Sequence, residues 1–536
     1  MTSESFIPRL GHMRYDFPSL NSAPLTLPVG LIVGIVVVLV VRYAKSPWRR
    51  VPPGPSGFPI LGNASKLRDM AWLLGQNCKK QFNEIMYCNA LGQPVIVINS
   101  HKVAAELLGR RANIYSDRPR LIVANDMLCG GLLYAFMPYG DLWRRTRRAA
   151  HESLTRSTVR DYHPILHKEA ILLASALLDS PVAREKHFQR SAASETMSIL
   201  YDYPTLETEN DKTLKEIHAF NDYVSEAAVP GAHLVELFPW MMHIPDSLAK
   251  WKREGKRYFI GYTNMFEGLF NNVRAEISKG SDRPSVSASL IKNSERSGLS
   301  NQEMAWLVGS LYSAGAETTY TAMNWFVLAM ITQPEIQKRA QSELDAVVGR
   351  SRTPAFSDAP SLPYIQAVVK EVLRWRPPLP LSIPHSTTED DWYDGMFIPK
   401  GTICLPNIWL CHHDPAFYGE DAANFNPGRF LDVEGKTATG PQESRDDGHS
   451  TYGFGRRACP GKHVANDSLF IFIATVLWAS NLERVYDQNG KETPLDMHSF
   501  IYNGVACRPV SYECTIKTRF PEALSILAEE KELLKA

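Results

Sequence analysis

The most specific pattern in the chain is the run Tyr452-Gly453-Phe454-Gly455-Arg456-Arg457-Ala458-Cys459-Pro460-Gly461. Its three glycines allow the backbone to turn sharply and to approach a flat, bulky group closely. Its two arginines can neutralise a thiolate and reach nearby carboxylates. A buried structural thiol is the usual explanation for a single cysteine, but a structural thiol does not need these neighbours. We therefore interpret Cys459 as a functional residue.

The run resembles the cysteine-ligand loop of the cytochrome P-450 monooxygenases, whose pattern is F-x-x-G-x-R-x-C-x-G. Gly455, Arg457, Cys459 and Gly461 match this pattern. Tyr452 departs from it, since the family usually has Phe there, but an aromatic ring is kept. The resemblance implies that Cys459 is the axial thiolate ligand of a haem iron and that the other matching residues belong to its binding loop. We expect the N–H of Gly461 and the N-terminus of the following helix to favour the thiolate.

A second segment, Ala314-Gly315-Ala316-Glu317-Thr318-Thr319, lies midway along the longest helix that the sequence predicts. A helix-interior Gly costs about 1 kcal/mol relative to Ala, and Thr competes for backbone hydrogen bonds. We expect a locally weakened helix with a groove for dioxygen and water, where Glu317 and Thr318 relay protons. The segment resembles the family's oxygen-activation pattern, A/G-G-x-D/E-T-T/S, at every position. By itself it is weak evidence, because a Thr pair in a helix is usually structural.

A third motif combines a helical pair with a later loop. Glu371 and Arg374 form E-x-x-R and share one helix face. Arg429 lies in Asn426-Pro427-Gly428-Arg429-Phe430, which resembles the family's P-x-R-F loop. The resemblance implies that these three side chains lock together behind the haem in a structural role.

A fourth motif, Trp143-Arg144-Arg145-Thr146-Arg147, resembles the family's W-x-x-x-R helix. Haem carries two propionates, which need buried cationic or N–H partners. The expected partners are Trp143, Arg147, His385 and Arg457. The other basic residues here form either a solvated face or a docking patch for an acidic redox partner; they are Arg144, Arg145, Arg148, Lys462 and His463.

The resemblance covers nearly the whole chain and implies the mainly α-helical P-450 fold, with a small β-sheet region and one N-terminal transmembrane helix. The implied function is insertion of one oxygen atom from O2 into a small lipophilic substrate. No G-x-G-x-x-G fingerprint follows a strand, so NADPH and flavins are expected on a separate NADPH-cytochrome reductase, with cytochrome b5 as a further electron donor. Within the family the chain resembles fungal membrane-bound enzymes of secondary metabolism, including O-methylsterigmatocystin oxidoreductase-like enzymes, which implies a terpenoid or polyketide pathway.

Two other functions stay open at this point. A haem-thiolate isomerase or dehydratase would need neither O2 nor a reductase, although such enzymes often lose the acid–threonine pair that Glu317 and Thr318 provide. A non-catalytic haem-binding membrane sensor would not need an oxygen groove.

Composition excludes other classes of protein. The chain has 536 residues, and 44% of them are hydrophobic, which is enough for a large core. A net charge of +1 argues against binding to nucleic acid. None of the eight cysteines forms a C-x-x-C pair, which argues against zinc ribbons. We expect all cysteines except Cys459 to be reduced and mostly buried, in a domain that faces the cytosol.

The N-terminus carries one membrane signal, because Leu25 to Val41 contains no charged residue. Its length lies at the short end of the roughly 17–25 residues that span a bilayer. Four basic residues follow it, which places the remainder of the chain in the cytosol. A cleaved signal peptide is the alternative, but no A-x-A-like cleavage site is present. We expect a single-pass protein of the endoplasmic reticulum membrane with a luminal segment (1–24), an anchor (25–44), a Pro/Gly-rich hinge (45–62) and a haem-thiolate catalytic domain (63–536).

Periodicity predicts one strand over 95–98 and several helices. The helices are 101–108, 141–151, 301–333, 335–348, 362–375, a final helix from just after Cys459 to about 481, and a helical region over 209–279 with breaks at 229–231 and near 238–239. The apolar segment at these breaks is either plain core or a lid that dips into the membrane; it contains Leu234, Leu237, Phe238, Trp240, Met241 and Met242.

Substrate contacts are expected from four segments that the family uses for this purpose. These are 120–136, 311–314, 379–383 and 500–502, with Leu311, Ala314, Leu379, Ile383 and Ile501 as individual candidates. Core packing is the alternative for each of them.

Overall fold

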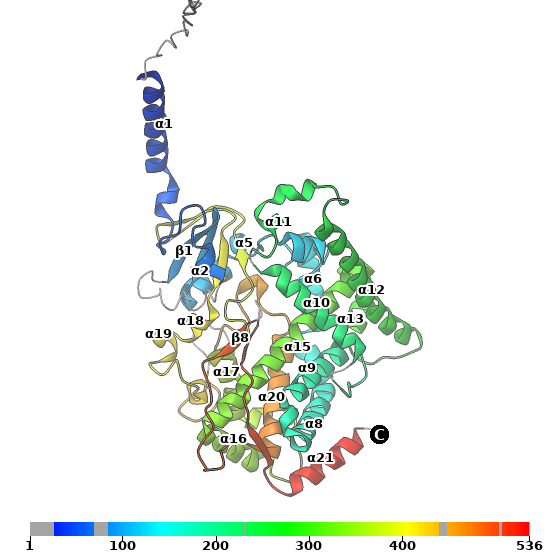
Figure 1. Ribbon diagram of the computed structural model, residues 1–536. Coiled ribbons are helices and arrows are strands. Elements are labelled where there is room, and N and C mark those ends of the chain that lie inside the picture. Colours follow the sequence, from blue (N-terminus) through cyan, green and yellow to red (C-terminus); the bar gives the residue numbers. More distant parts are fainter. Residues whose placement is uncertain are drawn as a thin grey trace, which may run out of the picture.

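The computed structural model describes residues 26–68, 84–208, 211–229, 231–438, 447–502 and 506–534. Helices make up most of the body, and small sheets lie beside them (Figure 1). The mainly α-helical class with a small β-sheet region is therefore confirmed.

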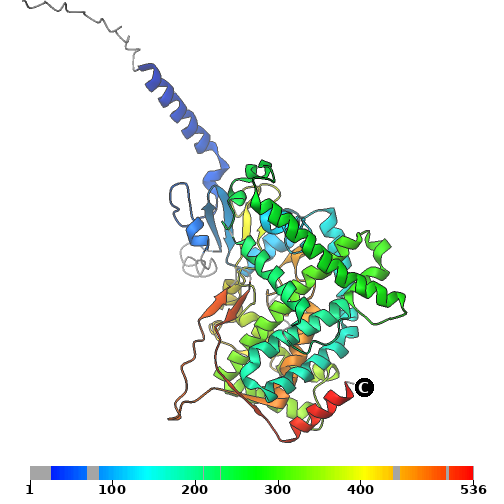
Figure 2. The ribbon, with the colours of Figure 1, turned by 45° about the vertical axis from the view of Figure 1, so that its right-hand side comes forward.

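The body is built around α15 (Asn301–Thr332), which is buried along most of its length. A reciprocal capping box starts this helix, since Ser300 Oγ accepts from the Glu303 N–H and Glu303 accepts from the Ser300 N–H. The helices with the most extensive packing on α15 are α9 (Arg184–Tyr201), α12 (Lys250–Ser278) and α20 (Lys462–Ala479). Figures 1 and 2 show α8 (His163–Asp179) on the outer side of this group, against α9 and α20.

The predicted helices are present, and others were missed. Those predicted are α4 (His101–Ala104) continued by the π-helix η2 (Ala105–Arg110), α6 (Asp141–Ser153), α15, α16 (Pro334–Val347), α17 (Pro363–Trp375) and α20. Two long helices that the sequence did not reveal are α8 and α9. The prediction that α20 is the final helix is wrong, because α21 (Glu522–Leu533) follows it.

Shorter helical elements connect the long helices. They are η1 (Pro47–Arg50), α2 (Ala64–Arg68), α5 (Ala112–Tyr115), η3 (Ile122–Met127), α7 (Arg156–Val159), η4 (Arg160–Tyr162), η5 (Pro181–Ala183), α13 (Val286–Lys292), α14 (Ser294–Ser297), η7 (Phe356–Ser361), α18 (Ile408–His412), α19 (Pro415–Tyr418), η8 (Pro427–Phe430) and η10 (Gly455–Arg457).

The region between α10 (Lys212–Ala228) and α12 is broken as predicted. It contains α11 (Leu234–Leu237) and the 3-10 helix η6 (Pro239–His243). Four of its apolar side chains have exposed fractions of 41% to 65%: Leu234, Leu237, Phe238 and Trp240. The plain-core interpretation is therefore wrong for these four residues, whereas Met241 and Met242 pack against the core.

In the described part of the chain, one four-stranded sheet and three two-stranded sheets accompany the helices. The larger sheet has the order β1-β2-β6-β3, formed by β1 (Ile85–Ala90), β2 (Gln93–Ile98), β6 (Ile403–Pro406) and β3 (His385–Ser386). Strands β2 and β6 are parallel and the other neighbours are antiparallel. The small sheets pair β4 (Asp391–Tyr393) with β5 (Met396–Ile398), β7 (Ser480–Glu483) with β10 (Thr515–Thr518), and β8 (Phe500–Tyr502) with β9 (Cys507–Pro509).

The N-terminal helix α1 (Thr26–Lys45) extends away from the body in both ribbon views (Figures 1 and 2). Its described apolar side chains are exposed from Val33 onward. Among the described residues, no helix is both long enough and apolar enough to cross a membrane. The predicted luminal segment, 1–24, lies outside the described residues.

Candidate active site

The cysteine loop lies against η2, and its glycines make this contact possible. Gly453 and Gly455 both have positive φ, at 75° and 57°. A Cβ atom on Gly455 would lie 2.0 Å from the carbonyl oxygen of Leu108. The Cys459 N–H donates to the carbonyl oxygen of Tyr452 at 2.8 Å, which closes the loop just before α20 begins. Gly455 is therefore required both by its φ and by the close approach of the two backbones.

Tyr452, the one departure from the family pattern, is accommodated by its own hydroxyl group. This hydroxyl donates to Asn466 Oδ1 on α20 at 2.6 Å. The polar atom that a phenylalanine would lack is thus satisfied inside the loop–helix contact.

Several groups act on the sulfur of Cys459. Burial raises the pKa of the Cys459 thiol, while a hydrogen bond from the Gly461 N–H and the charges of Arg147 and Lys462 lower this pKa. The expected N–H donor is therefore in place. A backbone donor and two nearby cations stabilise a negative sulfur, as a metal-ligating thiolate requires.

Arg457 stacks on Trp143 beside this loop. The guanidinium carbon lies 4.3 Å from the centroid of the Trp143 ring. Arg457 Nε donates to the Ser116 carbonyl and Nη2 to the Met137 carbonyl, both at 2.8 Å. Burial lowers the pKa of Arg457 to about 10. Within the described part of the chain, Arg457 Nη1 and Trp143 Nε1 are buried and have no hydrogen-bond partner.

Two further arginines lie around this pair. Arg147 donates to the Tyr134 hydroxyl at 3.0 Å. Arg118 was missed by the sequence analysis; it donates to Ala135 O at 2.9 Å and to Ile383 O and Pro384 O at 2.7 Å. Burial, reinforced by the charge of Arg457, holds the pKa of Arg118 well below its usual range. No family motif that the sequence offered includes Arg118.

His385 was expected as a cationic partner of a haem propionate, but its surroundings favour the neutral imidazole. It is buried in β3, and its Nδ1 lies 2.8 Å from the Tyr115 carbonyl oxygen. Burial and the charges of Arg118 and Arg457 hold the pKa of His385 well below its usual range, so the imidazole is neutral.

The residues of the loop and its surroundings fit a haem. Arg118, Arg147 and Arg457 donate to backbone carbonyls or a tyrosine, and none of them forms an ion pair with a described Asp or Glu. The cluster thus has three cations near one described carboxylate, that of Asp117, and two unpaired N–H donors, which suit a ligand with two carboxylates. The cysteine with its N–H donor suits the iron of the same ligand.

The middle of α15 is accessible, although the rest of the helix is mostly buried. Ala314 is exposed, and Leu311, Gly315, Glu317 and Thr318 are partly buried. The helix has no break here, so the expected weakening is not seen. Gly315 has another role, because a Cβ there would lie 3.2 Å from Thr196 Cγ2 on α9.

Glu317 and Thr318, the acid and the hydroxyl residue of this segment, have different surroundings. Burial raises the pKa of Glu317, whereas the charge of Arg508 lowers it and that of Asp222 raises it. Thr318 Oγ1 donates to the Ala314 carbonyl oxygen at 2.8 Å, as helix-interior threonines often do.

Glu371, Arg374 and Arg429 form a buried ion cluster. Arg374 donates to both carboxylate oxygens of Glu371, at 2.6 and 2.7 Å, and Arg429 Nε donates to Oε1 at 3.2 Å. The Asn426 N–H also donates to Oε1, at 2.7 Å. Arg374 further binds the carbonyls of His412, Ala422 and Asn424. The cluster joins α17 to the segment that leads into η8.

The five substrate candidates are all at least partly accessible. Leu311, Leu379 and Ile383 are partly buried, and Ala314 and Ile501 are exposed. Arg118 connects Ile383 with the loop 120–136 through Ala135. Tyr134, in the same loop, receives a hydrogen bond from Arg147 and feels the charge of Cys459. Two of the four predicted segments therefore meet at this arginine.

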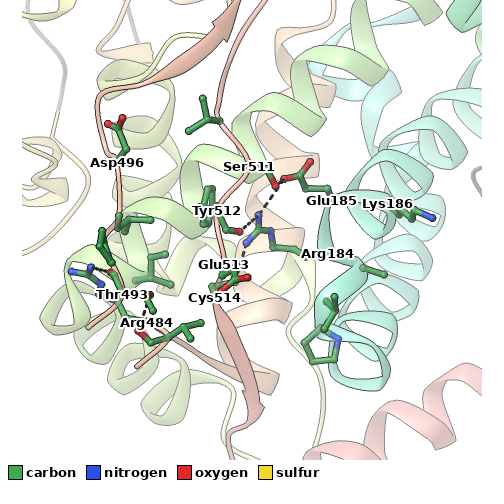
Figure 3. A pocket seen from close by; sticks show the side chains of 18 of the residues that line it. Arg184, Glu185, Lys186, Arg484, Thr493, Asp496, Ser511, Tyr512, Glu513 and Cys514 are labelled. Atoms are coloured by element: carbon green, nitrogen blue, oxygen red, sulfur yellow. Dashed lines mark hydrogen bonds and ion pairs between the residues drawn. The ribbon is translucent and has the colours of Figure 1, made fainter. Parts of the chain in front are cut away.

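A separate pocket of about 1160 Å³ lies between the start of α9 and the segments 484–496 and 510–514 (Figure 3). Buried Arg184 donates to Cys514 Sγ at 2.9 Å and stacks on Tyr512 there. Among the described residues that line this pocket, none is a predicted site residue.

The described cysteines form no disulfides, and most of them are buried, as expected for cysteines other than the proposed ligand Cys459. Seven of the eight cysteines are described and all are free; apart from Cys459 and the partly buried Cys514, they are buried. Cys78 lies outside the described residues.

A family model for cytochrome P450 matches residues 52–513. The chain belongs to the cytochrome P450 family. Curated relatives are fungal cytochrome P450 monooxygenases. One from Armillaria gallica is 52% identical over 95% of this chain and 98% of its own. One from Postia placenta is 42% identical over 94% of each chain, and one from Amanita muscaria is 39% identical over 90% and 94%.

A solved structure of a zebrafish cytochrome P450, with abiraterone, has the same fold. Its TM-score is 0.66 and its identity is 24%, over 84% of this chain and 100% of that one. The protein is thus a P450 monooxygenase, an oxidoreductase with a haem-thiolate cofactor.

Proposed function

We propose that this P450 monooxygenase oxidises a small lipophilic molecule of fungal secondary metabolism, with electrons that a separate reductase takes from NADPH. The observation that carries this proposal is the cationic cluster around Cys459, together with the accessible middle of α15. The fungal relatives support the pathway class.

Haem bound through Cys459 supplies the activation of dioxygen, because a thiolate ligand pushes electron density that favours O–O cleavage. Cys459 binds the iron, and the Gly461 N–H donates to its sulfur. The unpaired N–H groups of Trp143 and Arg457, with the cations Arg147 and Arg118, hold the propionates. Gly455 keeps the loop close to η2.

Glu317 and Thr318 form a proton relay. Since burial raises the pKa of Glu317, its carboxyl group retains a proton more readily than an exposed glutamate does. Thr318 Oγ1 donates to the Ala314 carbonyl and keeps a lone pair free to accept from water. In a relay through this pair, Glu317 releases a proton to water. Thr318 Oγ1 accepts a proton from that water and releases its own toward the site as its bond to the Ala314 carbonyl opens, and solvent returns a proton to Glu317. Leu311, Ala314, Leu379, Ile383 and Ile501 present apolar surface to the substrate.

A membrane association accounts for the exposed apolar surface. The described apolar side chains of α1 between Val33 and Val41 are exposed, and water alone is an unfavourable environment for such a stripe. Apolar residues around the base of α1 are also exposed, namely Phe58, Ile60 and Leu61. α11 lies at the same end of the molecule (Figures 1 and 2). α1 thus anchors the enzyme in the endoplasmic reticulum membrane, with the catalytic domain in the cytosol.

The redox partners bind near the cysteine loop. Arg144, Arg148 and Arg456 are exposed there, which suits the acidic surface of a reductase or of cytochrome b5.

The first experiment is an absorption spectrum of the reduced, CO-bound protein in membranes. A strongly red-shifted Soret band is expected for the wild type and for Cys514→Ala, which removes another partly accessible thiol. Cys459→Ala should lose this band. A retained thiolate spectrum in Cys459→Ala would overturn the ligand assignment, and turnover without O2 and reductase would favour an isomerase.

A further inference from the structure

Glu236 makes an unusual contact between two elements far apart in the sequence. Its Oε1 accepts from the Val123 N–H at 2.8 Å, and its Oε2 accepts from the Ile122 N–H at 3.0 Å. These two N–H groups open η3, and Glu236 lies in α11. One carboxylate therefore joins α11 to the first turn of η3 with two charge-assisted hydrogen bonds.

The loop that begins with η3 leads directly to the active site. It ends at Tyr134, whose N–H donates to Ser310 Oγ on α15 at 3.2 Å, next to the substrate candidate Leu311. The Tyr134 hydroxyl accepts from Arg147, and its pKa responds to Cys459. η3 thus belongs to the same loop as groups that contact α15 and Arg147.

The two sides of η3 are held in different ways. On the α12 side the contact is close-packed, because a Cβ on Gly255 would lie 3.0 Å from Met127 Cβ. On the α11 side, Val235 is buried, but its neighbours Leu234 and Leu237 are exposed. Glu236 supplies the polar connection there, so this side can separate more easily than the α12 side.

The segment after α11 has its own anchor. Lys252 Nζ on α12 donates to the carbonyls of Met242 and Ile244, both at 2.9 Å. Before α11, Gly231 has a φ of 81°, which gives the backbone a turn that other residues adopt with difficulty. α11 therefore lies between a glycine turn and the Lys252 anchor on α12.

We propose that Glu236 is a latch: it is a positioning residue that holds α11 closed on η3 and limits the entry and exit of bulky ligands between them. This inference rests on the proposed substrate contacts of loop 120–136. When both hydrogen bonds break, α11 moves away and η3 is released toward the site. Small ligands do not need this opening.

The test uses the full-length, haem-loaded enzyme in Glu236→Ala and Glu236→Gln. Hydrogen exchange at the Ile122 and Val123 amides should become faster in both variants. Association and dissociation of clotrimazole, a bulky azole, should accelerate at least about tenfold in Glu236→Ala, a factor that corresponds to about 1.4 kcal/mol. Glu236→Gln keeps one acceptor oxygen and should lie between this variant and the wild type. The rate of CO binding to the reduced enzyme should not change.

Glu254→Ala is the matched control, because Glu254 is a carboxylate on α12 whose recorded partner is Lys250, at 3.6 Å. It should leave the exchange and both binding rates unchanged. Faster amide exchange with unchanged clotrimazole rates would overturn the latch, and so would unchanged exchange. Equal acceleration of clotrimazole and CO would also overturn it. A normal Soret band for the CO complex in each variant shows that the haem site is intact, which separates failure of the latch from failure of the proposed function.

Discussion

Glu371→Gln removes the central negative charge of the buried ion cluster while it preserves the size of the side chain. Glu371 and Arg374 are fully buried, and the Arg429 side chain is 8% exposed. The substitution leaves two cations without their shared carboxylate and turns one of two acceptor oxygens into a donor that faces guanidinium N–H groups. Breaking such a buried pair typically costs about 3–5 kcal/mol. Whole domains are stable by only about 5–15 kcal/mol, so this loss should be large.

Arg374 also binds three carbonyl oxygens, and these bonds remain in the variant. We therefore expect the free energy of unfolding to fall by about 3 kcal/mol, the lower end of the range for breaking a buried ion pair. Urea unfolding of the holoprotein, followed by the Soret band and by circular dichroism, measures it. The control is Glu276→Gln, which breaks an ion pair of the same i,i+3 spacing with Lys279 on the surface. That change should leave the free energy of unfolding nearly unchanged, because exposed ion pairs contribute little to stability. Equal losses in the two variants would refute the argument that burial gives the cluster its importance.

Three other predictions concern single side chains. Burial raises the pKa of Glu195 to about 8 from a usual value of 4.5, so the folded protein keeps a proton that the unfolded chain releases. The free energy of unfolding should therefore fall as pH rises between these values, and urea titrations of Glu195→Gln across that range should lack this slope. Thr318→Ala should raise the share of NADPH electrons that appear as hydrogen peroxide; unchanged coupling would contradict the proton relay. Trp143→Phe removes a buried N–H donor worth about 1 kcal/mol and should speed haem transfer to apomyoglobin about fivefold; an unchanged transfer rate would show that the indole N–H does not hold the haem.

Sequence reasoning found the helices whose signals are local. α15 starts at a capping box, and α17 carries its polar, partly buried residues Gln366 and Lys370 at helical spacing among buried apolar ones, a pattern that its sequence already shows. α9 was missed because its buried positions include polar residues such as Arg190, Ser194 and Glu195. These residues bond to neighbouring helices: Arg190 Nη1 and Ser194 Oγ donate to Glu169 on α8, and Ser468 Oγ on α20 donates to Glu195. A helix buried on all sides with polar contacts lacks the apolar stripe on which periodicity depends.

The residues of the candidate site also fall into two groups, those that the sequence reveals and those that only the packed structure reveals. Cys459, Gly455 and the E-x-x-R pair belong to short motifs whose spacing is visible in the sequence. Glu236 and Arg118 bind backbone atoms of distant segments, and a backbone acceptor or donor leaves no trace in residue identity. At Gly315, sequence reasoning gave a local explanation to a residue whose role is a tertiary contact. It was explained by local helix weakening, but it lies where α9 approaches closely, a contact that only the packed structure reveals.

Arginine serves two opposite purposes in this protein, and the partners distinguish them. Arg374 shares the Glu371 carboxylate with Arg429, and Arg429 also pairs with Asp421, so two cations meet two carboxylates and the cluster fixes the fold. Arg118 and Arg457 instead donate to carbonyl oxygens, which orient a guanidinium without cancelling its charge. Burial lowers the pKa values of Arg118 and Arg457, because two charges removed from water are unfavourable until an anion binds beside them. A dianionic group that binds there relieves that cost, so haem binding and folding should reinforce one another.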